Sequence, residues 1–313
     1  MKVYFAPLEG LTDSVYRRLH CKYFPGVDRY YTPFFSPTIH RALTPKEARE
    51  LPPASSLPVT VIPQILTKSA EDFVWFAGEA ATLGYSEVNL NLGCPSGTVF
   101  SKGKGSGMLR DLDTLDRFLE DIFANSPLPI SVKTRLGVES AEEFPQLLTI
   151  LNRYPICELI LHPRVRTQFY KGLPDMDAFR YCYENSTPPV CYNGNLFTKQ
   201  DMKRISDAFP NCSALMLGRG LIADPGLCSG GTKRETLEAF TNELLKSYIE
   251  VFGSERNAMF RMKENWNLLL WKFENSEKLS KRLRKTTDIT EFRTITREIF
   301  ETLPMREDLC CNL

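Results

Sequence analysis

A cysteine stands where an apolar, alternating run ends, within the stretch NLNLGCPSGTVFSKGKGSGML at residues 89–109. Gly93 precedes Cys94 and Pro95 follows it, so a thiol is placed just beyond a predicted buried strand and a proline stiffens its approach. A thiol at a strand end is a candidate functional group, and an unperturbed thiol, with a pKa of about 8.5, is mostly protonated at neutral pH. A small core cysteine is the ordinary alternative, and the rest of the chain has to decide between the two.

Polar, ionisable or glycine residues also follow most other apolar runs of the chain. The ends of these runs carry Pro7, Gln64, Asn91, Lys133 with Arg135, His162, Asn193-Gly194-Asn195 and Gly218-Arg219-Gly220. Taken singly, each has an ordinary structural explanation, such as a lysine at a rim, a buried imidazole or an Asn-Gly turn. Catalytic residues of parallel α/β barrels gather where strands end, so the shared placement predicts one common site.

Eight apolar, β-branched runs are expected to form the strands that place these residues. They are Val3–Ala6, Val27–Pro33, Val59–Ile65, Glu87–Leu92, Ile130–Thr134, Glu158–His162, Val190–Asn193 and Ala214–Gly218. Their almost continuous hydrophobicity is typical of parallel strands that helices cover on both faces. Strands that alternate with helices over about 230 residues predict an α/β fold, a (β/α)8 TIM barrel, and a doubly wound open sheet remains the alternative.

Helical patterns fill most of the gaps between these runs. Residues 69–84 and 140–154 both begin with a serine that is followed three residues later by an acid, which is an N-terminal capping signal, and residues 111–123 carry an apolar stripe. From about residue 233 glycine becomes rare and long amphipathic runs take over. We therefore expect a catalytic barrel domain at 1–232 and a separate, all-helical domain at 233–313.

The glycines at the ends of the seventh and eighth strands predict a phosphate site. Backbone N–H groups at Gly194 and Gly218 can approach an anion because no side chain intervenes, and Arg219 adds a fixed positive charge. The glycines at 103, 105 and 107 have the wrong spacing and context for a dinucleotide-binding turn. A mononucleotide-like cofactor therefore fits better than one bound by a Rossmann fold.

Composition excludes several other classes of protein. The chain has 313 residues, of which 42% are hydrophobic and 25% charged, and its net charge is +1, so any nucleic-acid surface has to be a local patch. The nine cysteines include no CxxC pair, and Cys310–Cys311 lacks partners for zinc, so we expect no metal site and reduced thiols in the cytoplasm. No signal peptide or membrane-spanning run is found, no protein partner is predicted, and the chain is expected to be a monomer.

With these motifs in place, the chain resembles a known family, the tRNA-dihydrouridine synthases. The motifs that carry the resemblance occur in the family's order and cover nearly the whole predicted barrel: APLEGLTD (6–13), Gln64, NLNLGCPSG (89–97), KTR (133–135), HPRVRTQFYKG (162–172), NGN (193–195) and GRG (218–220). The helical tail occupies the place of that family's RNA-binding domain. Related flavin barrels, such as dihydroorotate dehydrogenases, share the cofactor chemistry but lack such a tail.

The resemblance implies an FMN-dependent enzyme that uses NADPH to reduce a uridine base of tRNA to 5,6-dihydrouridine. Hydride would pass from the flavin to C6 of the base, and Cys94 would donate the proton to C5. Gln64 and Lys133 would contact the flavin ring. The implied cofactor-binding residues are Pro7, Leu8, Glu9, Gln64, Lys133, His162, Asn193, Gly194, Asn195, Gly218 and Arg219.

The resemblance also implies that several basic residues bind tRNA. The segment 96–107 would be a mobile lid whose lysines, Lys102 and Lys104, contact RNA phosphates. The target uridine has to be turned out of its stack, so the tRNA must be gripped elsewhere, and the basic run KLSKRLRK at 278–285 would track its phosphates. The implied substrate and RNA contacts are Asn91, Lys102, Lys104, Arg135, Lys281, Arg282 and Arg284.

The chain departs from the family pattern at Leu8, where Met is frequent, at Pro163, where Gly is frequent, and at Asn195, where Asp is frequent. These departures suggest a subgroup of the family, and they leave the target nucleotide open. The choice between NADPH and NADH is also open. Two rival functions remain. One is a flavin barrel acting on a free pyrimidine or a small enone. The other is a non-redox protein, either a barrel with Lys133 as a Schiff base or an RNA-binding protein with an inactive site.

Overall fold

The computed structural model describes residues 1–38 and 40–309, so Cys310 and Cys311 lie outside the described residues. The chain forms two compact units. The barrel unit comprises Met1–Pro7, Asp28–Asn195 and Ile205–Met216, and the helical unit comprises Leu8–Val27, Leu196–Arg204 and Leu217–Leu313. The domain boundary expected after residue 232 stays a prediction.

The barrel unit is built around a nine-stranded parallel sheet. Its strands are β1 (Lys2–Phe5), β2 (Arg29–Tyr31), β3 (Thr60–Ile62), β4 (Gln64–Ile65), β5 (Val88–Leu92), β6 (Ile130–Arg135), β7 (Leu159–His162), β8 (Val190–Tyr192) and β9 (Ala214–Leu217). In space they follow the order β3-β2-β1-β9-β8-β7-β6-β5-β4. The two ends of this order, β3 and β4, are consecutive in the chain, so the sheet closes into the predicted barrel and the open-sheet alternative is wrong.

Pro63 divides the expected third strand, 59–65, into β3 and β4. Proline has no N–H to give to a ladder, so it interrupts a central strand. β3 pairs with β2 and β4 pairs with β5, while the Pro63 carbonyl accepts a 2.8 Å hydrogen bond from the Asn89 amide. The expectation of eight strands is therefore corrected to nine, with one chain segment joining both ends of the sheet.

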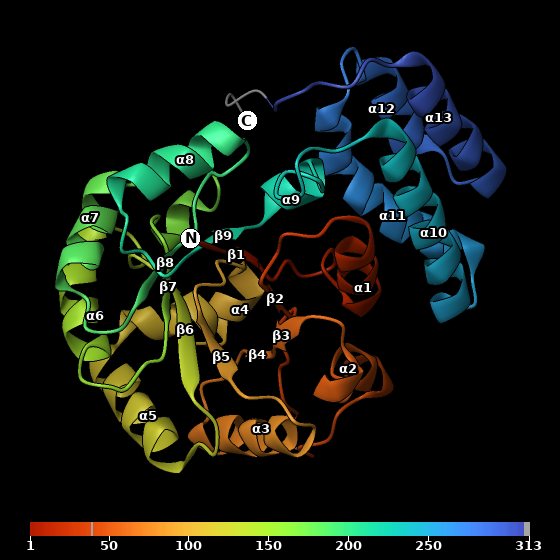
Figure 1. Cartoon of the computed structure of the whole chain (residues 1–313). Helices are drawn as coiled ribbons and strands as arrows, with labels where there is room; N and C mark the ends of the chain where they lie inside the picture. The colour runs from red at the N-terminus through yellow and green to blue at the C-terminus, as the bar shows by residue number, and fades with distance from the viewer. Residues whose placement is uncertain (39, 310–313) are drawn as a thin grey trace. The chain divides into compact units, whose positions relative to one another are not determined.

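Helices surround the strands of the barrel unit (Figure 1). They are α2 (Pro45–Glu50), α3 (Ala70–Thr82), α4 (Gly97–Ser101), α5 (Leu112–Asn125), α6 (Phe144–Leu151) and α7 (Met176–Asn185), and α8 (Lys199–Ala208) contributes residues to both units. The predicted helix starts are confirmed. Ser69 accepts from the Asp72 amide at 3.2 Å, and Ser140 and Glu143 form a reciprocal capping box before α6.

Apolar side chains fill the interior of the barrel. The buried cluster contains Tyr4, Ala6, Tyr31, Ile62, Ile160, Cys191, Ala214 and Met216. At the amino ends of the strands, Arg29 donates to Glu87 at 2.9 Å and lies 3.9 Å from Glu158. Burial raises the pKa of the Glu87 carboxyl. Because catalytic residues of such barrels lie at the carboxyl ends, this ionic cluster is a structural feature.

The helical unit contains α1 (Ser14–Tyr23), α9 (Arg219–Ala223), α10 (Arg234–Phe252), α11 (Glu255–Leu269), α12 (Glu277–Lys285) and α13 (Ile289–Thr302). Buried cations within this unit satisfy groups that would otherwise lack partners. Lys263 donates to the carbonyls of Arg284, at 3.1 Å, and Thr286, at the end of α12. Lys272 forms a buried 2.7 Å ion pair with Asp224.

Between residues 1 and 309, residue 39 aside, no helix is both long and apolar enough to cross a bilayer. Over the same described residues, no group of histidine, cysteine, aspartate and glutamate side chains is arranged to hold a metal ion. Every cysteine in that part of the chain is outside a disulfide.

Replacing Arg29 by methionine should destabilise the protein by about 3 kcal/mol, because it leaves the carboxylates of Glu87 and Glu158 buried without a counter-charge. The loss should shrink as the pH falls, since burial raises the pKa of the Glu87 carboxyl and its protonation removes an unpaired charge. Urea unfolding followed by circular dichroism at two pH values measures both effects. Arg153, in an exposed 2.7 Å pair with Asp116, is the matched control, and its methionine variant should lose less than about 1 kcal/mol. Equal losses for the two variants would contradict this assignment.

Candidate active site at the carboxyl ends of the strands

The register of the strands brings the predicted polar residues together at one end of the barrel. Asn91 lies opposite Lys133, and Arg135 lies opposite His162. Lys133 also pairs with Ile160, a member of the interior cluster, so its side chain points to the inside. Arg135 follows two residues later on the same strand and shares that direction. The strand ends therefore supply one polar rim, as the sequence predicts.

A chain of buried side chains joins β4, β5 and β6 beneath this rim. Asn89 donates to Ser131 Oγ at 2.8 Å. Gln64 Nε2 donates to Asn89 Oδ1 at 2.8 Å, and Gln64 Oε1 accepts from Asn91 Nδ2 at 2.8 Å. Asn91 Oδ1 then accepts from the backbone N–H of Cys94 at 2.9 Å. Each polar side chain is held by the next, and the last one fixes the turn that carries the thiol.

The glycine-rich segment after Cys94, expected to be a mobile lid, folds as two short helical turns. α4 (Gly97–Ser101) is followed by a 3₁₀ turn at Gly105–Arg110. Ser106 Oγ donates to the Cys94 carbonyl at 2.7 Å. Gly105 has a φ of +57°, and a Cβ there would lie 3.1 Å from the Cys94 Cβ, so both the backbone and the packing require glycine. Cys94 is half-buried beneath this segment, whose role as a lid stays a prediction.

Lys133 brings a positive charge to the rim. Across residues 1–38 and 40–309, no side chain forms a hydrogen bond or an ion pair with its ammonium group. Burial, and secondly the charge of Arg135, lowers the pKa of Lys133 to about 8, while a Cys94 thiolate would raise it. A negatively charged ligand would supply the missing counter-charge. The residues present therefore fit an anionic cofactor.

Arg135 ties the loop after β7 to the end of β5. Its side chain is only 2% exposed. Nε donates to the Gly93 carbonyl at 2.9 Å, and Nη1 donates to the carbonyls of Val165 and Phe169 at 3.2 and 2.8 Å. Because three carbonyl groups occupy this guanidinium, the arrangement favours a positioning role over the predicted contact with RNA.

Arg164 connects the ends of β7 and β8, and it is fully buried. Its Nη1 lies 2.9 Å from His162 Nε2. A guanidinium only donates, so Nε2 accepts, and the imidazole is neutral with its proton on Nδ1. Nη2 donates to the Gly172 carbonyl at 2.6 Å and to Asn195 Oδ1 at 3.1 Å. Sequence reasoning assigned no role to Arg164, although its place two residues beyond a strand end was a signal.

The loop after β7 contains a strained turn. The Lys171 amide donates to the Gln168 carbonyl at 2.8 Å, which closes a four-residue turn with Phe169 in second position. Phe169 has φ 51° and ψ −99°, close to the type II′ position that glycine normally occupies, at a cost of about 1–3 kcal/mol for other residues. The Arg166 guanidinium lies 3.8 Å from the centre of the Phe100 ring, so the loop also contacts α4. None of the four turn residues, 168–171, is a glycine, a proline or an asparagine, so the sequence does not signal the turn.

The predicted Asn193-Gly194-Asn195 turn follows β8. Asn193 Nδ2 donates to the Met216 carbonyl at 2.8 Å. A Cβ at Gly194 would lie 2.1 Å from the Tyr192 hydroxyl, so only glycine fits there. Pro7 ends the first segment of the barrel unit. The other predicted cofactor residues belong to the helical unit, and their part in a cofactor site stays a prediction: Leu8, Glu9, Gly218 and Arg219.

The two lysines predicted to contact RNA from the 96–107 segment differ in their surroundings. Lys102 is exposed to solvent. Lys104 is half-buried, and its ammonium group donates to Ser36 Oγ at 3.0 Å. Burial lowers the pKa of Lys104. Lys102 is therefore the better placed of the two for a phosphate.

The basic run at 278–285 forms α12, as expected for a phosphate-tracking face. Leu279 and Leu283 are buried on one side of it, which turns Lys281 and Arg284 toward solvent. Arg282 instead forms a 2.7 Å ion pair with Glu298 of α13. Lys281 and Arg284 are therefore exposed to solvent, whereas Arg282 is already paired with a carboxylate.

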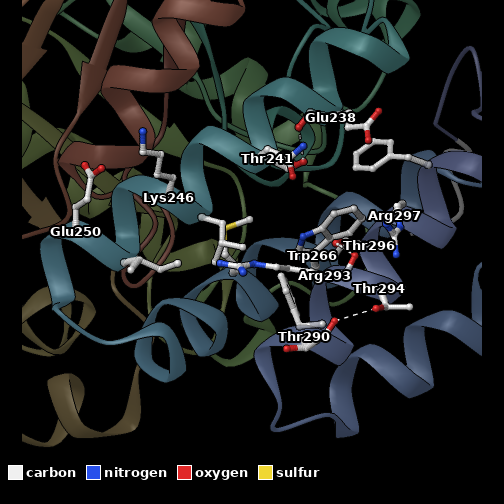
Figure 2. Close-up of a pocket in the computed structure, with 16 residues that line it drawn as sticks. Glu238, Thr241, Lys246, Glu250, Trp266, Thr290, Arg293, Thr294, Thr296 and Arg297 are labelled. Atoms are coloured by element: carbon white, nitrogen blue, oxygen red, sulfur yellow. Dashed lines mark hydrogen bonds between the residues drawn. The ribbon is translucent and has the colours of Figure 1, made fainter.

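A groove of about 570 Å³ lies between α10, α11 and α13 in the helical unit (Figure 2). Trp266 lies at the base of the groove. At its edge, the Thr294 hydroxyl donates a 2.9 Å hydrogen bond to the Thr290 carbonyl. Its charged lining residues are Glu238, Lys246, Glu250, Arg293 and Arg297. Neither a cysteine nor a histidine lines this groove, so the chemical groups of the barrel rim are not repeated there.

Comparison with known proteins finds relatives along nearly the whole chain. The family model for dihydrouridine synthase matches residues 4–303. A tRNA-dihydrouridine(16) synthase of Neisseria meningitidis serogroup B is 26% identical over 317 residues, which covers 95% of this chain and 94% of that protein. A protein of the same name from Escherichia coli strain K12 is 29% identical over 238 residues, covering 72% of this chain and 74% of that protein.

Among solved structures, morphinone reductase in complex with tetrahydroNAD has a similar fold. The TM-score is 0.51 at 10% sequence identity, over 73% of this chain and 85% of that chain. At this identity the likeness shows the fold alone. The family match, by contrast, spans every strand that carries the rim and most of the helices beyond residue 233. The chain therefore belongs to the dihydrouridine synthase family.

Proposed function

We propose that this protein reduces a uridine of tRNA to 5,6-dihydrouridine and that uridine 16 is its target. The names of the relatives from Neisseria meningitidis and Escherichia coli support the substrate and the position. The observation that carries the proposal is the half-buried Cys94, held by Asn91 and Ser106 within electrostatic reach of Lys133 and Arg135. This arrangement suits the addition of a proton to one carbon of a C=C bond while hydride is added to the other.

FMN is the proposed cofactor, and NADPH is the proposed reductant. When bound, the flavin would accept a hydride from the nicotinamide and supply it to C6 of the base. Gln64, Lys133, His162 and the 193–195 turn would hold it, and Lys133 would supply the positive charge that an anionic ring or phosphate requires. The fold shared with morphinone reductase, which was solved with tetrahydroNAD, supports a nicotinamide reductant.

Cys94 is the proposed general acid. Its S–H bond breaks as a C–H bond forms at C5 of the base, and the electron pair left on sulfur makes it a thiolate. The positive charges of Lys133 and Arg135 stabilise that thiolate. Attraction between a Cys94 thiolate and these cations opposes the effect of burial on their pKa values, and the same attraction favours the anion. Water returns the proton before the next turnover. The bonds from Asn91 and Ser106 hold the Cys94 backbone still throughout.

The tRNA has to be held while its uridine is out of the stack, which costs a few kcal/mol. The exposed cations of α12, Lys281 and Arg284, and Lys102 of the barrel unit are the proposed phosphate contacts. The reaction would take place in the cytoplasm, where a reducing environment keeps Cys94 as a thiol. We propose that the protein acts as a monomer.

Replacing Cys94 by alanine should leave flavin binding intact and lower dihydrouridine formation by about 10²- to 10⁴-fold, because the general acid is lost. Mass spectrometry of treated tRNA measures the product, and visible absorption measures the flavin. Cys157, an exposed thiol at the amino end of β7, is the matched control, and its alanine variant should keep full activity. Equal product from the Cys94 variant and the wild type would remove Cys94 from this role. Colourless preparations that cannot be reconstituted would refute the cofactor.

Replacing Lys133 by methionine should stabilise the cofactor-free protein and weaken flavin binding. The pKa of Lys133 is lowered from 10.5 to about 8, so the protonated side chain disfavours the folded state below pH 8. That cost disappears as the pH rises from 8 to 10.5, so the gain in thermal midpoint should be largest below pH 8 and shrink above it. Thermal unfolding across this range, with the exposed Lys102→Met as control, tests the sign. A midpoint lower than that of the wild type at pH 7 would disprove the assignment.

Replacing both Lys281 and Arg284 by glutamine should make tRNA binding less sensitive to salt. Each lost phosphate contact lowers the slope of log K against log salt concentration by about 0.7 to 0.9. Fluorescence anisotropy with labelled tRNA at several salt concentrations measures this slope. Arg282→Gln is the matched control, because Arg282 is already paired with Glu298. A larger change for Arg282 than for the other two residues together would show that a different face binds the RNA.

A further inference from the structure

The loop after β7 exposes large apolar side chains next to the polar rim. We call residues 166–173 the aromatic loop. Within it, Phe169 is 42% exposed, Tyr170 is 46% exposed and Leu173 is 80% exposed. Arg166 and Lys171 lie on either side of the two aromatic residues in the sequence, and Lys171 is also exposed. A water-facing segment that combines cations with aromatic rings is typical of surfaces that bind single-stranded nucleic acid.

The backbone holds the Phe169 ring in solvent against its own preference. Phe169 occupies the glycine position of a type II′ turn. The Arg166 guanidinium lies 5.8 Å from the centre of the Phe169 ring. With so much of the ring exposed, packing against the protein offsets little of the turn's strain. A strained residue with an exposed aromatic ring indicates a function outside the folding of the chain.

A single guanidinium connects this turn to the thiol. Arg135 donates to the carbonyl of Phe169 at 2.8 Å and to the carbonyl of Gly93, the residue before Cys94, at 2.9 Å. The Tyr170 ring lies 6.1 Å from the His162 ring and 5.7 Å from the Arg135 guanidinium. The aromatic loop is therefore fastened to the backbone beside Cys94, at the edge of the candidate site.

We propose that Phe169 is a stacking platform for the nucleotide next to the target uridine. This inference rests on the proposed function, because it requires a uridine that has left its stack. A flipped base leaves its neighbour with one uncovered face, and an aromatic ring held rigidly beside the site covers that face. Arg166 and Lys171 flank the ring on the same loop and supply contacts for the phosphates on either side of that nucleotide.

The experiment compares the flavin-loaded wild type with Phe169→Gly, Phe169→Leu and Leu173→Gly. The glycine variant removes the ring and also relieves the turn, so its thermal midpoint should equal or exceed that of the wild type. The leucine variant keeps an apolar side chain without an aromatic face. Leu173→Gly is the matched control for loss of an exposed apolar side chain from the same loop. The probe is transcribed tRNA with 2-aminopurine on either side of uridine 16.

Both Phe169 variants should lower kcat/KM for tRNA by about 5- to 150-fold, the range expected for one lost stacking contact. The quenching of 2-aminopurine that the wild type produces on one side of the uridine should also be lost. The rate of NADPH oxidation without tRNA should stay unchanged in both variants. Leu173→Gly should behave as the wild type in all three measurements.

Unchanged kcat/KM and quenching in the Phe169 variants, with normal dihydrouridine formation by the wild type, would overturn this inference and leave the proposed function standing. A loss confined to NADPH oxidation would overturn it in favour of a nicotinamide as the partner of the ring. A fall in the thermal midpoint of Phe169→Gly would overturn it in favour of a structural role. Absence of dihydrouridine in tRNA treated with the wild type would instead refute the proposed function itself.

Discussion

Buried amide groups inside the barrel have to satisfy one another, and this constraint sets the geometry of the rim. An enclosed polar group without a partner costs about 1–3 kcal/mol. Ser131, Asn89, Gln64 and Asn91 avoid that cost by bonding in series across three strands. Because the series ends on the backbone of Cys94, the bonds that make a polar interior tolerable also hold the thiol in place. Stability and positioning therefore depend on the same side chains.

The cations near the rim divide into two kinds. Arg135 and Arg164 are buried, and their donors are occupied by carbonyl groups, an imidazole and an amide, so they connect the loops after β5, β7 and β8. A guanidinium suits this task because it offers five donors in a fixed plane. Lys133 is different, since burial lowers its pKa and no side chain in the described part of the chain pairs with its ammonium group. Such a group disfavours the folded state until a ligand arrives, which is a common relation between stability and function.

Strand ends, helix caps and the barrel itself could be predicted because they depend on local pattern. An apolar run followed by a polar residue, or a serine three residues before an acid, is visible without knowing what lies beside it. The series of amides could not be predicted, because it depends on which strands are neighbours and in what register. The burial of Arg135 could not be predicted for the same reason, because nothing in its neighbouring sequence distinguishes it from an exposed arginine. The turn at Phe169 breaks the usual turn chemistry, so no local rule indicated it.

Closure at Pro63 also bears on how the protein behaves when crowded. β-sheets aggregate most readily through a long unpaired edge, to which another chain can add a strand. Here the outer side of β3 is only three residues long, and β4 bridges Phe35 on its side away from β5. A second molecule finds too short a template on the intact barrel. Fibril formation would have to begin from partly opened molecules in which residues 60–65 have come away and exposed the neighbouring strands.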